Sequence, residues 1–326
     1  MINILDSYQA IGIVGLAKNT GKTTTLNYLI NQYQHEVLGL TSIGLDGEPL
    51  DQVNFMPKPK IMVYPNMVVA TAKECLTHSL AKIEIIQTTS LITALGPIMI
   101  GRVKEAGTIM LAGPTTNREM NHLLSMLKHY VKRIFVDGAF NRMTFSSIRE
   151  LDGMVLATGA AFSPVMQETI DKTAFIVQLF SLRPSKQHYD IQGSMMINTD
   201  HQTYSSSIKS LGWFEKTLKT IKEPIRWIYV KGAITERLMH VMLETRVSGI
   251  RLLIDDPTKM LIHHSWMNQI KKMNVDIHVL KSIPLLWITM NPWSPDTKGY
   301  DESLFYHGLK DVIAIKIDNV KRLETS

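Results

Sequence analysis

Residues 15–23 read Gly-Leu-Ala-Lys-Asn-Thr-Gly-Lys-Thr, and this segment most constrains what the chain can fold into. It closely resembles the phosphate-loop pattern G-x-x-x-x-G-K-[ST]. The Gly-Lys-Thr end is intact, but the first glycine lies one place early, because the strict position is occupied by Leu16. A short apolar run at 10–14 precedes the segment, and apolar residues follow at helical spacing from position 26. The order strand, loop, helix is the context that this motif requires.

The residue types of this loop suit a nucleoside triphosphate. Main-chain N–H groups can surround phosphate oxygens, because Gly21 has no Cβ and the following helix points its positive end at the same anion. Lys22 supplies a compact cation for the outer phosphates, and the Thr23 hydroxyl is placed to ligate Mg²⁺. No guanine-reading N-K-x-D motif is found, which favours ATP over GTP. The predicted nucleotide-binding residues are Ala17, Lys18, Asn19, Thr20, Gly21, Lys22, Thr23 and Thr24.

Two aspartates are candidates for carboxylates beside the phosphates. Asp137 ends the apolar run at 134–136, where a P-loop ATPase needs a carboxylate for the magnesium shell. Asp46 follows another expected strand and could orient the attacking water or touch magnesium through water. Each aspartate precedes a glycine, so a simple turn is the alternative for both. We predict Lys22, Asp46 and Asp137 as catalytic residues, and Thr23 and Asp137 as magnesium ligands.

Strand-like and helix-like stretches alternate along the chain, which predicts an α/β fold. In the first part we expect strands at 10–15, 36–43, 60–64, 83–87, 97–103, 108–112, 133–137 and 153–158, and helices at 21–33, 117–130 and 165–181. After a polar, proline-containing break at 182–187, we expect strands at 191–197, 227–230, 249–254, 275–280, 285–290 and 312–315, and helices at 233–245 and 257–272.

These elements predict a P-loop domain over 1–183 and a second, smaller α/β domain over 188–326. Several strands of the first domain are continuous apolar runs, which suits a doubly wound, mostly parallel sheet. Residues 46–96 lack a strong helical period, so we expect an insertion of short strands and loops there.

Composition excludes several classes of protein. Of 326 residues, 45% are hydrophobic and 20% are charged, as in an ordinary globular protein. The formal charge of +6 is spread along the chain without aromatic interleaving, so we expect no nucleic-acid partner. The single cysteine, Cys75, excludes an internal disulfide framework and a cysteine metal cluster. No apolar run reaches membrane-spanning length and no leader pattern opens the chain, so we expect a cytoplasmic protein without a membrane partner.

Four segments together resemble KamB, the family of reactivase subunits encoded with lysine 5,6-aminomutase in anaerobic lysine fermentation. They are residues 15–29, 41–48, 136–142 and 156–161. The resemblance implies a nucleotide-binding fold similar to that of dethiobiotin synthetase. It also implies a repair ATPase that uses ATP to release damaged cobalamin from an aminomutase that depends on adenosylcobalamin and pyridoxal phosphate. The implied partners are the aminomutase and a companion reactivase subunit, KamC, and the second domain would face them.

Two other functions remain open from the sequence. A ligase similar to dethiobiotin synthetase would use the same scaffold to activate a carboxylate by phosphoryl transfer. Such a ligase needs a second site of cationic and polar groups, which Lys18, Arg118 and Arg142 could build. A nucleotide-gated binding protein without useful turnover is the other alternative. The sequence does not decide the oligomeric state, and a homo-oligomer is among the options.

Overall fold

The computed structural model describes residues 4–46, 61–139 and 150–324 of the chain. The chain divides into two compact units. The larger unit consists of Met1–Ala174 and Ile283–Ser326, and the smaller unit is Phe175–Ser282. The larger unit carries a mostly parallel sheet and the smaller unit a mixed sheet, so the predicted fold class of two α/β units is confirmed.

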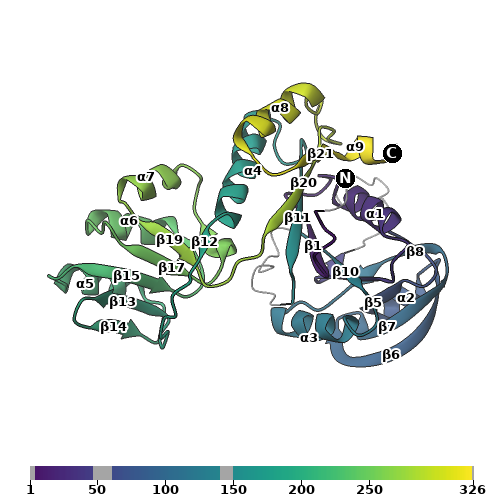
Figure 1. The fold of residues 1–326 in the computed structure, drawn as a ribbon, viewed down its shortest axis with the longest axis horizontal. Coiled ribbons are helices and arrows are strands. Elements are labelled where there is room, and N and C mark those ends of the chain that lie inside the picture. The colour runs from purple at the N-terminus through teal and green to yellow at the C-terminus, as the bar shows by residue number, and fades with distance from the viewer. Residues whose placement is uncertain (1–3, 47–60, 140–149, 325–326) are drawn as a thin grey trace. The chain divides into compact units, whose positions relative to one another are not determined.

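The larger unit is built on one long sheet with helices packed on it (Figure 1). Its strands are β1 (Ala10–Gly15), β2 (Leu38–Ser42), β3 (Leu45–Asp46), β4 (Ile61–Val63), β5 (Val68–Ala72), β6 (Lys82–Thr93), β7 (Gly96–Glu105), β8 (Gly107–Ile109), β9 (Leu111–Ala112), β10 (Arg133–Ala139), β11 (Gly153–Gly159), β20 (Leu285–Asn291) and β21 (Ile317–Asn319). Its helices are α1 (Lys22–Gln32), α2 (Lys73–Thr77), α3 (Asn117–Leu127), α8 (Glu302–Val312) and α9 (Val320–Glu324), and the chain passes to the smaller unit within α4 (Met166–Phe180).

Among the described residues the large sheet has nine strands in the order β21-β20-β11-β1-β10-β2-β5-β7-β6. The strands from β21 to β5 are parallel, and β7 and β6 are antiparallel at one edge. Every residue of β1, β11 and β20 is buried, as expected for apolar strands covered on both faces. The parallel strands therefore all end at the same edge of the sheet.

The chain crosses from one side of β1 to the other between β10 and β11. β10 pairs with β1 so that Asp137 lies opposite Ile13, and β11 pairs on the other side so that Ala157 lies opposite Gly15. In open α/β sheets, ligands bind outside the carboxyl ends of the strands at such a switch point. The fold therefore places the loop after β1 where a ligand is expected.

The end of the chain belongs to the larger unit, which differs from the predicted second domain over 188–326. β20 pairs in parallel with β11, and β21 pairs in parallel with β20. A buried strand reads as the same apolar run whichever sheet it joins, so the pattern at 285–290 did not reveal its neighbours. The strand expected at 312–315 is wrong: Val312 ends helix α8, whose first turn is capped by the Asp301 carboxylate.

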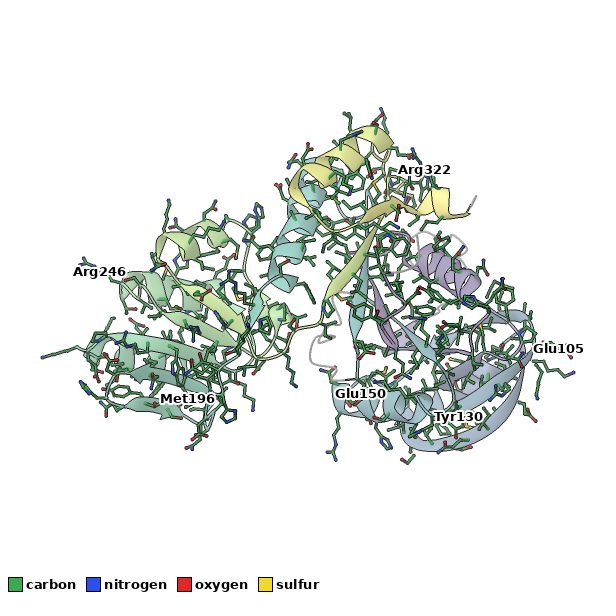
Figure 2. The ribbon with its side chains drawn as sticks, viewed as in Figure 1. Glu105, Tyr130, Glu150, Met196, Arg246 and Arg322 are labelled. Carbon is green, nitrogen blue, oxygen red and sulfur yellow. The ribbon has the colours of Figure 1, made fainter. Side chains whose placement is uncertain are left out.

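Part of the expected insertion at 46–96 is integral to the large sheet. β5 pairs in parallel with β2, and β6 forms a long hairpin with β7, visible as the curved pair of strands in Figure 1. Tyr130, labelled in Figure 2, donates a hydrogen bond to Gln87 of β6 over 3.2 Å. Strands β5, β6 and β7 thus extend the large sheet, whereas β4 pairs with β8 in a small sheet of its own, and residues 47–60 lie outside the described part of the chain.

The smaller unit has a second sheet whose described strands follow the order β12-β19-β17-β15-β13-β14. The strands of the smaller unit are β12 (Arg183–Pro184), β13 (Met195–Thr199), β14 (Thr203–Ser206), β15 (Ile225–Val230), β16 (Ile234–Thr235), β17 (Arg251–Ile254), β18 (Met260–Leu261) and β19 (Asp276–Val279). Its helices are α5 (Leu211–Thr220), α6 (Glu236–Glu244) and α7 (Trp266–Lys272), with a 3-10 turn at Pro257–Lys259. Met196, labelled in Figure 2, belongs to its core together with Tyr189, Tyr229 and Leu253.

No helix in the described part of the chain is long and apolar enough to cross a membrane.

Candidate phosphate-binding site

The loop between β1 and α1 adopts a backbone suited to an anion. Asn19 and Gly21 both have positive φ, 61° and 90°, on either side of Thr20. Alternation of left- and right-handed residues turns successive N–H groups to one side and creates an anion-binding concavity. At Gly21 a side chain would be strained by the positive φ and would lie 3.1 Å from a Val320 methyl group. The loop therefore has both the shape and the glycine that a phosphate site requires.

Leu16 explains the displaced first glycine of the motif. Its N–H donates to Ala157 O over 2.8 Å, which continues the pairing of β1 with β11. Its side chain is buried in the core, 3% exposed. Position 16 thus belongs to the sheet rather than to the mouth of the loop, and a leucine can stabilise it there.

Internal hydrogen bonds hold the loop and the first turn of α1. The Thr20 hydroxyl donates to Ala17 O over 2.9 Å. The Thr25 hydroxyl donates to Gly21 O over 3.0 Å and lies 2.8 Å from the Thr289 hydroxyl of β20. These buried contacts fix the loop before any ligand arrives, which lowers the entropy that binding must overcome.

Lys22 and Asp137 form an ion pair at the start of α1. The Lys22 Nζ lies 3.0 Å from Asp137 Oδ1, and the side chains are 15% and 2% exposed. The Lys22 ammonium is held in place by α1, and the Asp137 carboxylate by β10, which is the strand next to β1. The structure thus brings together two of the three predicted catalytic residues, from segments 115 positions apart in the sequence (137 − 22 = 115).

The residues present fit a magnesium ion shared with a polyphosphate. Thr23 is the second residue of α1 and directly follows Lys22, whose ammonium lies beside the Asp137 carboxylate of β10. Hydroxyl and carboxylate oxygens are the ligands that Mg²⁺ prefers, and it commonly takes one or two from the protein and the rest from phosphates and water. The described residues contain no group of three or more His, Cys, Asp or Glu side chains that could hold a metal without such a ligand.

For the other predicted site residues, the structure gives the position in the fold. The backbone of Asp46 lies in β3, opposite Leu111 of β9, and Ile43 N donates to Asp137 O over 2.9 Å. The chain that leads to Asp46 therefore leaves the sheet beside Asp137, while the role of the Asp46 side chain stays a prediction. Lys18 is exposed in the loop. Thr24 lies in the first turn of α1.

The second cationic site of the ligase alternative receives no support from the described residues. Arg118 is exposed in the first turn of α3. Arg142 lies outside the described residues.

Sequence reasoning missed one residue at this site, Asn291. Its Nδ2 donates to Asn19 O over 3.0 Å, although the two residues are 272 positions apart. The signal was present, because Asn291 is a polar residue that directly follows a buried apolar run, as Asp137 does. It was overlooked because that strand was assigned to the second domain.

No protein-family model matches the chain, and comparison with curated proteins and with solved structures gave no match either. Functional inference therefore depends on the geometry of the site and on the resemblance of the four sequence segments.

Proposed function

We propose that the chain binds and hydrolyses ATP with Mg²⁺ at the loop between β1 and α1. We further propose that it is the ATP-dependent subunit of a reactivating factor for a cobalamin- and pyridoxal phosphate-dependent lysine 5,6-aminomutase. The observation that carries the nucleotide part is the ion pair of Lys22 with the buried Asp137 carboxylate, beside a loop with two left-handed residues. The aminomutase part rests on the resemblance to KamB.

The chemistry follows from the groups at the start of α1. The main-chain N–H groups of residues 17–24 and the Lys22 ammonium bind the polyphosphate and offset its charge. Thr23 and Asp137 are the residues that would hold Mg²⁺, which would neutralise charge on the outer phosphates. Asp46 is the candidate for orienting the attacking water, since its strand begins beside Asp137.

A reactivase must convert nucleotide hydrolysis into a change in its affinity for the mutase. This requires an element with two states that ATP and ADP stabilise to different extents. The segments around Asp46 and Asp137 are the candidates, because β2 leads to Asp46 and ends beside Asp137, and Asp137 pairs with Lys22 at the phosphate loop. The smaller unit, Phe175–Ser282, is proposed as the part that contacts the aminomutase or the companion subunit KamC.

The test is ATP turnover measured with and without partners. We expect slow turnover by the chain alone and a rise when aminomutase carrying inactivated cobalamin is added together with KamC. Lys22→Ala is the control for nucleotide-dependent turnover, and freshly reconstituted aminomutase is the control for damage. No rise with the inactivated aminomutase would contradict the reactivase. Faster ADP release with a carboxylic or amino acid, and no protein partner, would indicate the ligase instead.

A further inference from the structure

We infer that Asn291 is a positioning residue for the phosphate loop: its side-chain amide orients the peptide between Asn19 and Thr20 so that the Thr20 N–H faces the bound phosphates. The inference rests on the proposed nucleotide site. It assigns to β20, far from the sequence motif, a part in forming that site.

The hydrogen bonds of Asn291 define how its amide is oriented. Nδ2 donates to Asn19 O over 3.0 Å, and Oδ1 accepts a hydrogen bond from Trp293 N over 3.1 Å. The opposite orientation would place two oxygens against each other at Asn19 and two donors against each other at Trp293. The side chain is 8% exposed, so water competes little for either bond. The amide donor is therefore committed to the phosphate loop.

This bond determines which way the neighbouring N–H points. No cis peptide bond is found in the described residues, and in a trans peptide the C=O and the following N–H point in opposite directions. Because the Asn19 carbonyl is turned to Asn291, the Thr20 N–H is turned away from it. Thr20 lies between the two left-handed residues that form the concave part of the loop. Its N–H is thus directed to the side on which an anion would be bound.

Such a restraint matters because Asn19 has a φ of 61°, and asparagine adopts right-handed and extended conformations as well as this left-handed one. Without the bond to Asn291, the peptide at 19–20 is free to turn its carbonyl toward the anion instead. A loop held ready loses less entropy and gains more affinity when the ligand binds.

Asn291 also joins the loop to a second strand end. Its main-chain O accepts a hydrogen bond from Ala160 N over 2.9 Å, just after β11, where Gly159 pairs with Asn291. One residue thus links the phosphate loop, the turn after β11 and the turn after β20. Stabilisation of the loop by phosphate should therefore also stabilise these two turns.

Asn319 offers a matched control. It ends the neighbouring strand β21, is 5% exposed, and its Oδ1 accepts a hydrogen bond from Lys321 N over 3.0 Å, as Oδ1 of Asn291 does from Trp293 N. Its Nδ2 makes no hydrogen bond to the phosphate loop among the described residues. The two asparagines therefore share residue type, burial, strand end and local turn, and differ in the contact with Asn19.

The experiment compares Asn291→Ala with Asn319→Ala in the full chain, using calorimetric titration with Mg·ATP and with tripolyphosphate. In Asn291→Ala, the loss of one hydrogen bond to the loop should weaken the binding of both ligands by the same factor, roughly 3- to 10-fold. Asn319→Ala should bind both as the wild type does. Hydrogen exchange should also show that ATP protects the amides of 160–163 in the wild type and less so in Asn291→Ala.

Thermal unfolding distinguishes a structural defect from a local effect on the loop, since a defect would lower the melting temperature of Asn291→Ala well below that of Asn319→Ala. If Asn291→Ala unfolds too readily, the comparison is made between Asn291→Asp and Asn319→Asp instead. Both aspartates keep the oxygen that accepts the hydrogen bond of the local turn, and both add one negative charge. Equal affinities in wild type and Asn291 variants, or equal losses at 291 and 319, would overturn the inference. No binding by the wild type would overturn the proposed site itself.

Discussion

Asp137→Asn separates the structural role of the Lys22–Asp137 pair from its role in catalysis. The substitution keeps the shape of the side chain and removes its charge. The Lys22 ammonium then faces a neutral amide rather than a carboxylate 3.0 Å away. The two roles predict different changes in three measurable quantities: stability, ATP affinity without magnesium, and turnover with magnesium.

The effect on stability should be moderate. At 3.0 Å and an effective dielectric constant of about 20, the two charges attract with about 5–6 kcal/mol before solvation is counted. Burial of a carboxylate that is 2% exposed offsets much of this attraction. Lys22 is 15% exposed and can turn to water once its partner is neutral, so the loss should stay below the roughly 3–5 kcal/mol of a fully buried unpaired charge. We expect the free energy of unfolding to fall by about 1–3 kcal/mol.

The effects on the nucleotide should have opposite signs. Without magnesium, the Asp137 carboxylate repels the polyphosphate and competes with it for Lys22. Its removal should therefore strengthen binding of metal-free ATP by a few-fold to about tenfold, equivalent to about 1 kcal/mol. With magnesium, turnover should fall by about 100-fold or more, because the charge that holds the metal shell is gone.

Three measurements distinguish the structural role of the pair from its catalytic role: calorimetric titration with ATP in EDTA, steady-state turnover in excess magnesium, and thermal unfolding. Unchanged magnesium-dependent turnover would remove Asp137 from the site. If Asp137→Asn instead binds metal-free ATP more weakly, in proportion to its loss of stability, the ion pair has only a structural role. That result would refute the proposed competition between Asp137 and the polyphosphate for Lys22.

Two further substitutions test the loop and the larger unit. Gly21→Ala should lower the free energy of unfolding by about 1–2 kcal/mol, because its φ is 90°, and should weaken ATP binding as well. Gly232→Ala, at a φ of 74° in the smaller unit, is the control that should lose stability but not ATP affinity; equal ATP affinity in both variants would contradict the prediction. Burial would raise the pKa of Glu36, but hydrogen bonds from Lys132 and Arg133 outweigh it and hold the pKa below its usual value. This stabilisation is present above the unfolded-state pKa of Glu36 and is lost as pH falls through the lower folded-state value. Glu36→Gln should therefore make urea unfolding depend less on pH in the acid range, and an unchanged acid dependence would show that the pair contributes little.

The sequence predicted those parts of the site that are encoded locally. β1 has the predicted bounds, because its apolar run ends at a glycine and the loop motif follows at once. The place of Asp137 beside Lys22 could be predicted as well, since it follows an apolar run of a parallel strand, and parallel strands end at the same edge of a sheet. These features depend on residues that are close in the chain or on a rule about where parallel strands end.

The parts that could not be predicted depend on contacts between distant segments. β20 returns from the smaller unit to the large sheet, and nothing in its apolar run distinguishes this from a strand of the smaller sheet. Asn291, the polar residue at the end of this run, is visible in the sequence, but its contact with Asn19 depends on which sheet the strand joins. α8 is hard to predict for another reason: the β-branched Val312 and Ile313 at its end favour a strand, and only the cap at Asp301 marks its start.

The most direct test of the central claim is calorimetric titration of the chain with ATP in the presence of magnesium, beside Lys22→Ala. We predict saturable heat with a stoichiometry near one in the wild type. Lys22→Ala, folded by circular dichroism, should give none. Absence of heat with the wild type, or equal binding by the variant, would contradict the conclusion that this loop and its lysine hold a polyphosphate.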